Sequence, residues 1–189
     1  MDVLKNAQRV GARATACVAA IVAMAFAPQA PADTSLEYAV KAAYLSKFGI
    51  FVDWPKSAFE TPQSPVVLCV AGQDPFDGTL DKVVEGQHIG EHPLTIRRMK
   101  TVTRNSGCDI LYAGGSDEQP IDQALAAVNG TNVLTVTDTA GRGQAAGIVD
   151  FVIQNNRVRF NIDDRAAAQN GIIISSHLLS LALSVRPRN

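Results

Sequence analysis

The chain has 189 residues, of which 47% are hydrophobic and 19% are charged, and its formal net charge at pH 7 is −1. This length fits one domain with a sizeable core, and a chain so apolar and so close to neutrality is not intrinsically disordered. The sequence pI near 6.3 argues against a nucleic-acid-binding protein, which normally presents a basic face.

The first 32 residues have the pattern of a secretory signal peptide. Three basic residues precede an uncharged apolar run over residues 14–27, which is shorter than the ~20 residues that span a membrane. Cleavage after Ala32 follows an A-x-A pattern, whereas cleavage after Ala27 would place Pro28 beside the scissile bond. We therefore expect residues 33–189 to form a single exported domain, with a buried or amphipathic N-terminal helix as the alternative to a signal peptide.

Removal of residues 1–32 changes both the charge and the cysteine count. The remaining 157 residues carry a net charge of −3, and Cys17 is lost. Cys69 and Cys108 are then an even pair in an oxidising compartment, which indicates a disulfide; two buried free thiols are the alternative. Such a bridge would close a loop of about 40 residues and stabilise the fold by ~3–4 kcal/mol in the chain-entropy model.

Hydrophobic periodicity predicts a long first helix. Thr34 and Glu37 have capping-box spacing, and the helix is expected to run to about Val52, before Pro55. Its apolar stripe at three- and four-residue intervals comprises Leu36, Val40, Ala43, Tyr44, Phe48 and Phe51.

The rest of the chain alternates short apolar runs with helical patterns. We expect core strands at 65–71, 108–113 and 132–136, an outer strand at 92–99, helices at 76–84 and 120–128, and a hairpin over 147–162 that turns at Asn155-Asn156. Helix–strand alternation followed by a hairpin predicts an α/β fold, a three-layer α/β/α sandwich with a mixed central sheet, a C-terminal β-hairpin and a C-terminal helix.

Polar residues mark the ends of the two C-terminal helices. Asp163 is expected to cap a short helix that ends at Gly171, and Ser175 to cap the last one. The apolar stripe of that last helix runs from Leu178 to Val185. The two cysteines fall in or beside core strands, so a disulfide is possible if those strands are neighbours.

The motifs that resemble catalytic or cofactor sites lack the context such sites need. Residues 141–146 (GRGQAA) resemble a dinucleotide fingerprint, but a strand follows where a helix is required, so we interpret them as a loop. His88 and His92 flank Gly90, which argues against a zinc-binding helix. Ser176 and His177 are helical neighbours that do not face each other. We therefore expect that the protein is not an enzyme and that it binds neither a metal nor a cofactor.

Arginines offer a second kind of site. Arg157 and Arg159 alternate along a strand and so share one face, and Arg97 adds positive charge elsewhere. We consider them candidate contacts for a small anion, with an ordinary solvated surface as the alternative.

Short motifs lie along the whole mature chain, namely residues 37–45 (EYAVKAAYL) with Phe48, 51–55 (FVDWP), 68–72 (LCVAG), 74–76 (DPF), 107–112 (GCDILY), 147–151 (GIVDF), 157–162 (RVRFNI), 171–172 (GI), 174–176 (ISS), 178–179 (LL) and 181–182 (LA). In this order they resemble the motifs of the YfiR family of periplasmic proteins. Each motif alone is accounted for by the apolar pattern of a buried core, but together the motifs span essentially the whole mature chain.

The resemblance implies a regulator that binds the periplasmic domain of an inner-membrane diguanylate cyclase and represses it, which lowers cyclic di-GMP signalling and restrains biofilm formation. It implies release by reducing or envelope stress, or by capture by an outer-membrane lipoprotein. The Cys69–Cys108 bridge would then be a clamp and the redox-sensitive element. The second cysteine pair of the best-known member is missing from this sequence.

Two other functions remain open at this stage: a periplasmic small-ligand sensor without a cyclase partner, and a structural accessory protein of the envelope. A homodimer is also open. Candidate partner-binding residues lie where aromatic or charged side chains interrupt a buried pattern, namely Phe48, Trp54, Asp164, Arg165, Gln169 and His177.

Overall fold

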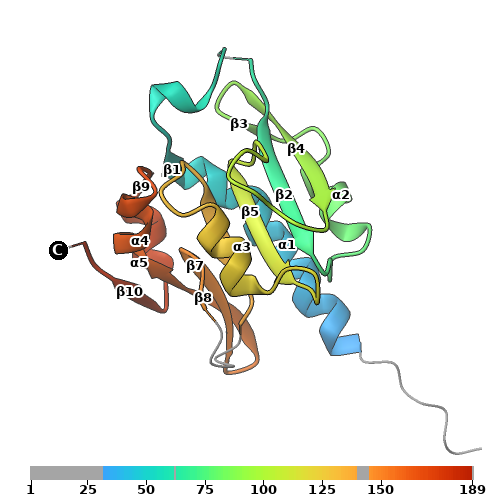
Figure 1. Cartoon of the computed structure of the whole chain (residues 1–189). Helices are drawn as coiled ribbons and strands as arrows, with labels where there is room; N and C mark the ends of the chain where they lie inside the picture. Colours follow the sequence, from blue (N-terminus) through green and yellow to red (C-terminus); the bar gives the residue numbers. More distant parts are fainter. Residues whose placement is uncertain (1–31, 62, 140–144, 189) are drawn as a thin grey trace, which may run out of the picture. The chain divides into compact units, whose positions relative to one another are not determined.

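A mixed sheet forms the centre of the fold in the computed structural model, which describes residues 32–61, 63–139 and 145–188 (Figure 1). Within these residues its strand order is β10-β8-β7-β6-β5-β2-β4-β3. The strands are β2 (Val66–Gly72), β3 (His88–Ile89), β4 (His92–Met99), β5 (Ile110–Gly115), β6 (Leu134–Thr137), β7 (Val149–Gln154), β8 (Arg157–Asp163) and β10 (Ser184–Arg186). In the part of the sheet ordered β4-β2-β5-β6-β7, all neighbouring strands run parallel. β7 and β8 form an antiparallel hairpin.

Helices cover both faces of this sheet (Figure 1). They are α1 (Ala32–Phe48), α2 (Thr79–Val84), α3 (Ile121–Ala127), α4 (Asp164–Gln169) and α5 (Ser176–Leu181), with short 3₁₀ turns at Gly49–Phe51 and Lys56–Ala58. Core residues of α1, α2, α4 and α5 belong to one hydrophobic cluster and those of α3 to another. A separate ribbon pairs β1 (Val52–Asp53) with β9 (Ile173–Ile174).

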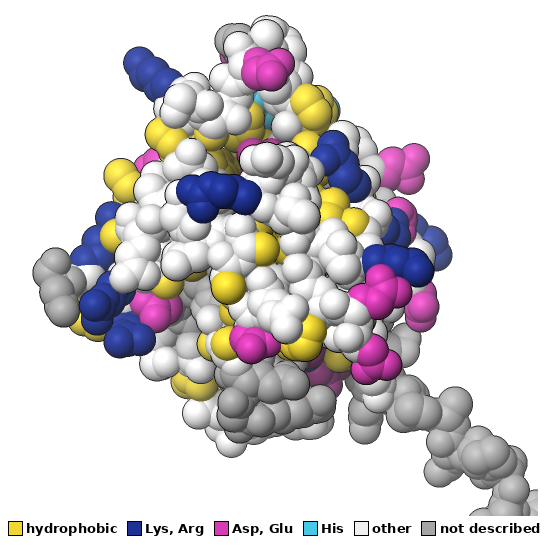
Figure 2. Space-filling model, in the orientation of Figure 1, with side chains coloured by type: hydrophobic (Ala, Val, Ile, Leu, Met, Phe, Trp, Pro, Cys, Tyr) yellow, Lys and Arg dark blue, Asp and Glu magenta, His cyan; other side chains and the backbone are white. Residues whose placement is uncertain are grey.

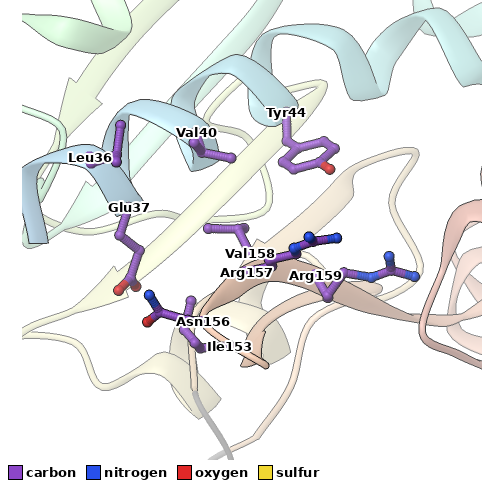
Figure 3. Close-up of a pocket in the computed structure, with 9 residues that line it drawn as sticks. All are labelled: Leu36, Glu37, Val40, Tyr44, Ile153, Asn156, Arg157, Val158 and Arg159. Atoms are coloured by element: carbon purple, nitrogen blue, oxygen red, sulfur yellow. The ribbon is translucent and has the colours of Figure 1, made fainter. Parts of the chain in front are cut away.

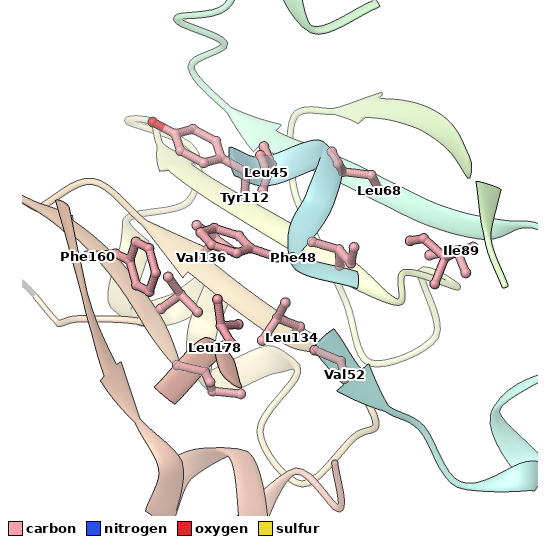
Figure 4. Packing of buried hydrophobic residues seen from close by; sticks show 14 of the residues in the cluster. Leu45, Phe48, Val52, Leu68, Ile89, Tyr112, Leu134, Val136, Phe160 and Leu178 are labelled. Carbon is pink, nitrogen blue, oxygen red and sulfur yellow. The ribbon is translucent and has the colours of Figure 1, made fainter. Parts of the chain in front are cut away.

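Strand β2 shows how the sequence builds the two core layers. Its side chains alternate, so that Leu68 and Val70 enter the cluster under α1 (Figure 4), whereas Cys69 and Ala71 enter the cluster under α3. A strand buried on both faces must be apolar throughout, which is why residues 66–71 form a continuous apolar run. The three-layer sandwich with a mixed sheet is thereby confirmed.

The predicted C-terminal hairpin and helix caps are also confirmed. Asn155 and Asn156 turn the β7–β8 hairpin with φ of 51° and 59°, angles that asparagine tolerates better than most residues. Asp163 accepts a hydrogen bond from the backbone N–H of Ala166 at 2.9 Å, and Ser175 accepts one from that of Leu178 at 3.3 Å.

The first and last helices were both predicted to extend too far. α1 ends at Phe48 and passes through a 3₁₀ turn into β1, instead of continuing to Val52. α5 ends at Leu181, because residues 184–186 add a parallel strand to the open edge of β8 instead of continuing the stripe to Val185. Backbone groups at that sheet edge offer hydrogen bonds that sequence periodicity does not reveal.

Other boundaries shift by a few residues. α2 begins at Thr79, not at Phe76, whose backbone N–H is bonded to the Asp74 carboxylate in a turn. β1, β3 and β9 were not predicted, because a two-residue strand carries too little alternation to be recognised. No helix in the described part of the chain has the length and apolar character needed to cross a bilayer.

Candidate functional site

Helix α1 has apolar residues on two faces, and the sheet covers only one of them. Ala42, Leu45 and Phe48 are buried against the sheet. Leu36 and Val40 are 68% and 37% exposed. The single buried stripe predicted for this helix was therefore wrong, because it combined residues from both faces.

The second face of α1 borders an apolar groove, here named the α1 groove, with a volume of about 580 Å³. Its walls come from α1, the following 3₁₀ turn, β8 and α5, and Lys47 is the one charged lining residue among those that the structure describes. The lining residues are Ala39, Val40, Ala43, Tyr44, Lys47, Phe48, Ile50, Phe51, Phe160, Leu178 and Leu181. Ile50 and Leu181 are 52% and 47% exposed, so the groove presents an apolar surface to solvent of the kind that marks interaction sites.

A second hollow of about 460 Å³, the hairpin hollow, lies between α1 and the β7–β8 hairpin (Figure 3). It shares Val40 and Tyr44 with the α1 groove, so the two surfaces are continuous. Arg157 and Arg159 both line it, as expected of alternate residues on one strand, and Glu37 lies across from them on α1. The hollow therefore adds a charged rim to the apolar groove.

Arg97 does not join the other two arginines. It lies on β4, on the far side of β2 from β8, and its guanidinium donates to the carbonyl oxygen of Ser106 at 2.7 Å. An anion site that uses all three arginines is thus incompatible with the fold.

The candidate partner-binding residues scatter over several elements. Phe48 is 1% exposed and packs on Phe151 and Phe160, so it forms the floor of the α1 groove and is not a surface anchor. His177 is exposed on α5, with its ring centroid 5.5 Å from that of Phe51. These two residues lie in or beside the groove.

The remaining four candidates lie outside the groove lining. Trp54 is half-buried and donates through Nε1 to the carbonyl oxygen of Asn132 at 2.9 Å. Asp164 is buried and forms an ion pair with Arg188 at 2.8 Å. Arg165 and Gln169 are exposed on α4. Trp54 and Asp164 therefore make structural contacts within the fold.

Sequence reasoning missed Ile50 and Leu181, the most exposed apolar residues of the groove, as interaction residues. A signal was present, because apolar residues occupy more of the α1 surface than one contact with a sheet can bury. The end of the helix and the returning α5 had to be placed before these residues could be assigned to one surface.

The structure joins Cys69 and Cys108 in a disulfide, with Cα atoms 5.7 Å apart. The bridge connects β2 to the residues just before β5, its neighbour in the sheet. Asp109 supports the same junction, because its carboxylate accepts from the backbone N–H of Val67 at 2.8 Å and its own N–H donates to the Val67 carbonyl. Burial raises the pKa of Asp109, and the hydrogen bond from Val67 opposes that shift.

The disulfide and the α1 groove lie on opposite faces of the sheet. Both cysteines belong to the cluster under α3, whereas the groove-lining Phe48 and Phe160 belong to the cluster under α1. A change at the disulfide can therefore reach the groove only through the strands themselves.

The other motifs make local contacts. His92 contacts the Ser64 carbonyl through Nδ1 at 2.7 Å and stacks on Phe59, whereas His88 is 3.2 Å from the Gly86 carbonyl. In the described ranges no group of three or more His, Cys, Asp or Glu side chains is placed to hold a metal ion. Most of residues 141–146, interpreted as a loop, lie outside the described residues.

Comparison with known families agrees with the motif pattern. A family model described as YfiR/HmsC-like matches residues 38–183, which include most of α1, the disulfide, the hairpin and α5. The chain belongs to the YfiR/HmsC-like family.

Proposed function

We propose that this protein is a periplasmic regulator, not an enzyme, and that it binds the periplasmic domain of an inner-membrane diguanylate cyclase and holds it inactive. Family membership supports the regulatory role. The observation that carries the mode of action is the α1 groove, an exposed apolar surface of the kind that marks interaction sites. Repression lowers cyclic di-GMP and restrains biofilm formation.

The shape and charge of this surface define the partner segment. Ile50 and Leu181 flank an apolar groove, which suits an apolar side-chain stripe such as one face of a helix. Arg157 and Arg159 in the adjoining hairpin hollow suit acidic residues next to that stripe. The cyclase segment is therefore apolar with an acidic flank.

Substitutions of exposed groove residues test the surface without disturbing the core. Ile50→Glu and Leu181→Glu each place a charge in the apolar contact, so the variants should lose capture of the cyclase from membranes and raise cellular cyclic di-GMP. Ile173→Glu is the matched control, because Ile173 is 54% exposed but lies on β9, outside the groove lining.

Two results would contradict the proposal at different levels. If both groove variants repress as well as Ile173→Glu does, the docking surface is wrong. If deletion of the gene leaves cyclic di-GMP and biofilm unchanged, the regulatory function itself is wrong. Identification of the membrane protein captured by the exported wild-type chain distinguishes a cyclase from any other partner.

Redox sensitivity is the finer part of the proposal. Leu68 and Val70 of β2 pack under α1, on the same strand that carries Cys69. Reduction of the bridge would loosen the β2–β5 junction and, through β2, the support of α1. Cys69→Ser combined with Cys108→Ser should therefore raise cyclic di-GMP at normal protein level, and an unchanged level would exclude a redox switch.

A further inference from the structure

A polar pocket lies at the point where the sheet reverses its direction of growth. From β2 the chain passes to β4 on one side, and then returns to β5 on the other side of β2. The connections therefore leave the carboxyl ends of β2 and β5 in opposite directions. In open α/β sheets this switch point leaves a crevice in which small ligands bind.

The crevice in this protein, here named the switch-point pocket, has a volume of about 350 Å³. That size is in the range of small-molecule sites. Its lining comes from α1, from β5, from the first residue of α3 and from the segments that follow β2, β5 and β6. The lining residues are Tyr38, Gln73, Pro75, Tyr112, Gly114, Gly115, Ser116, Asp117, Pro120, Ile121 and Asp138.

Backbone contacts form the floor of the pocket. The N–H of Gln73, just beyond β2, donates to the carbonyl of Gly115 at 2.9 Å. Gly114 lies so close to Gln73 that a Cβ atom there would overlap its carbonyl oxygen. Glycine allows this approach, so the two strand ends meet without side chains filling the space above them.

Tyr112 supplies a polar group to the pocket. Its side chain is 3% exposed and lines the pocket, and its ring packs edge-on against Phe76 with centroids 4.7 Å apart. No atom of the described residues hydrogen-bonds its hydroxyl group. Burial, followed by the nearby carboxylates, raises the pKa of Tyr112, so the phenol stays neutral. The ring of Tyr112 is thus buried while its hydroxyl group reaches the pocket, where it can accept a hydrogen bond from a bound ligand.

The charge of the pocket selects the kind of ligand. Among the described residues, Asp117 and Asp138 line it, and no lysine or arginine does. Lys41 lies behind Asp138, 1% exposed, and forms ion pairs with both Asp138 and Glu37. Its single positive charge is therefore already matched, and the lining carboxylates leave a negative potential in the pocket.

We propose that the switch-point pocket binds a small organic amine, whose ammonium group pairs with Asp138 and Asp117 and donates to the hydroxyl oxygen of Tyr112. Carboxylates and a phenol oxygen all accept hydrogen bonds, which matches an ammonium group, a donor without acceptors. An anion would meet two carboxylates. The site does not depend on the cyclase proposal, because it lies apart from the lining of the α1 groove.

Calorimetric titration of the mature chain with matched probes tests the inference. Putrescine and spermidine carry the proposed ammonium groups, whereas butanediol and succinate keep the four-carbon length of putrescine with neutral or anionic ends. We expect binding of at least one amine, weakened by added salt, and no binding of succinate.

Variants locate the site. Tyr112→Phe removes only the hydroxyl, and Asp117→Asn removes an exposed carboxylate, so each should weaken amine binding by about fivefold or more, as loss of a hydrogen bond to a charged group does. Tyr44→Phe and Asp122→Asn are matched controls outside the pocket lining and should bind as the wild type does.

Three outcomes would overturn the inference. The first is no binding of either amine at concentrations up to about 10 mM, which corresponds to only ~3 kcal/mol of binding free energy. The second is binding of butanediol or succinate as tight as that of the amines. The third is amine binding that Tyr112→Phe and Asp117→Asn leave unchanged.

Discussion

The two ends of the β2–β5 strand pair are built in opposite ways. At the amino end the Cys69–Cys108 bridge and the Asp109 carboxylate close the junction with covalent and hydrogen bonds. At the carboxyl end the strands meet through glycine backbone and leave a polar pocket above them. The comparison shows that one pair of core strands can be covalently closed at one end and border a hollow at the other.

Loss of the disulfide should have the largest effect. Cys69→Ala combined with Cys108→Ala is expected to lower the free energy of unfolding by about 3–4 kcal/mol, because the unfolded chain regains the entropy of a loop of about 40 residues. Urea denaturation measures the change. Wild-type protein in reductant should approach the same midpoint, and an unaltered midpoint on reduction would show that the bridge contributes no stability.

A methyl group added at the carboxyl end of the β2–β5 strand pair should have the next largest effect on stability. Gly114→Ala places a Cβ atom against the Gln73 carbonyl, and backbone cannot move aside cheaply. We expect a loss of about 2–3 kcal/mol in the free energy of unfolding. Gly78→Ala is the control, because nothing lies within 4 Å of a Cβ atom there. Equal stability of the two variants would contradict the tight junction.

Loss of an ion pair behind the switch-point pocket should have the third largest effect on stability. Asp138→Asn leaves the buried Lys41 with Glu37 alone and should cost about 1–2 kcal/mol of unfolding free energy, because a buried charge loses one of its partners. Glu37→Gln should cost less, since the Glu37 side chain is 31% exposed and that of Asp138 only 10%. Thermal denaturation compares them, and the reverse order would contradict the role assigned to Asp138.

The smallest effect should be the pH dependence of stability that Asp109 causes at the amino end of the β2–β5 strand pair. The pKa of Asp109 is raised in the folded protein, mainly by burial. Its contribution to stability is therefore fully present below the ordinary aspartate pKa of ~3.9 and is lost as pH rises through the raised value. Asp109→Asn keeps an oxygen acceptor for the Val67 N–H but does not titrate. The stability of this variant relative to wild type should increase across that pH window, and a flat difference would exclude the linkage.

The sequence predicted the layers of the fold because local pattern and burial agree there. Residues 66–71 had to be apolar throughout, and Asp163 and Ser175 cap the helices they precede. The sequence was a poor guide to burial where the same residue type occurs in both a buried and an exposed environment. Lys41 and Lys47 lie six residues apart on the same helix, yet Lys41 is buried in an ion-pair cluster and Lys47 is exposed.

The candidate site was the least predictable part. Arg157 and Arg159 share a face because strand geometry is local, but Arg97 lies on β4, beyond β2, and no local pattern reveals that. The predicted partner residues included Phe48 and Asp164, both of which are buried. Aromatic and charged residues that interrupt a pattern are therefore not reliable markers of an interface when packing or an ion pair accounts for them.

What the sequence alone determined is the set of local choices: apolar strands, helix caps, an even cysteine pair in residues 33–189 and the motif order of the YfiR/HmsC-like family. Only the tertiary structure decided which face of α1 is covered, that α5 completes the α1 groove, and that the connections after β2 and β5 diverge around a polar pocket. The physical reason is that periodicity reports which residues can be buried, whereas the finite area of the sheet decides which of them are.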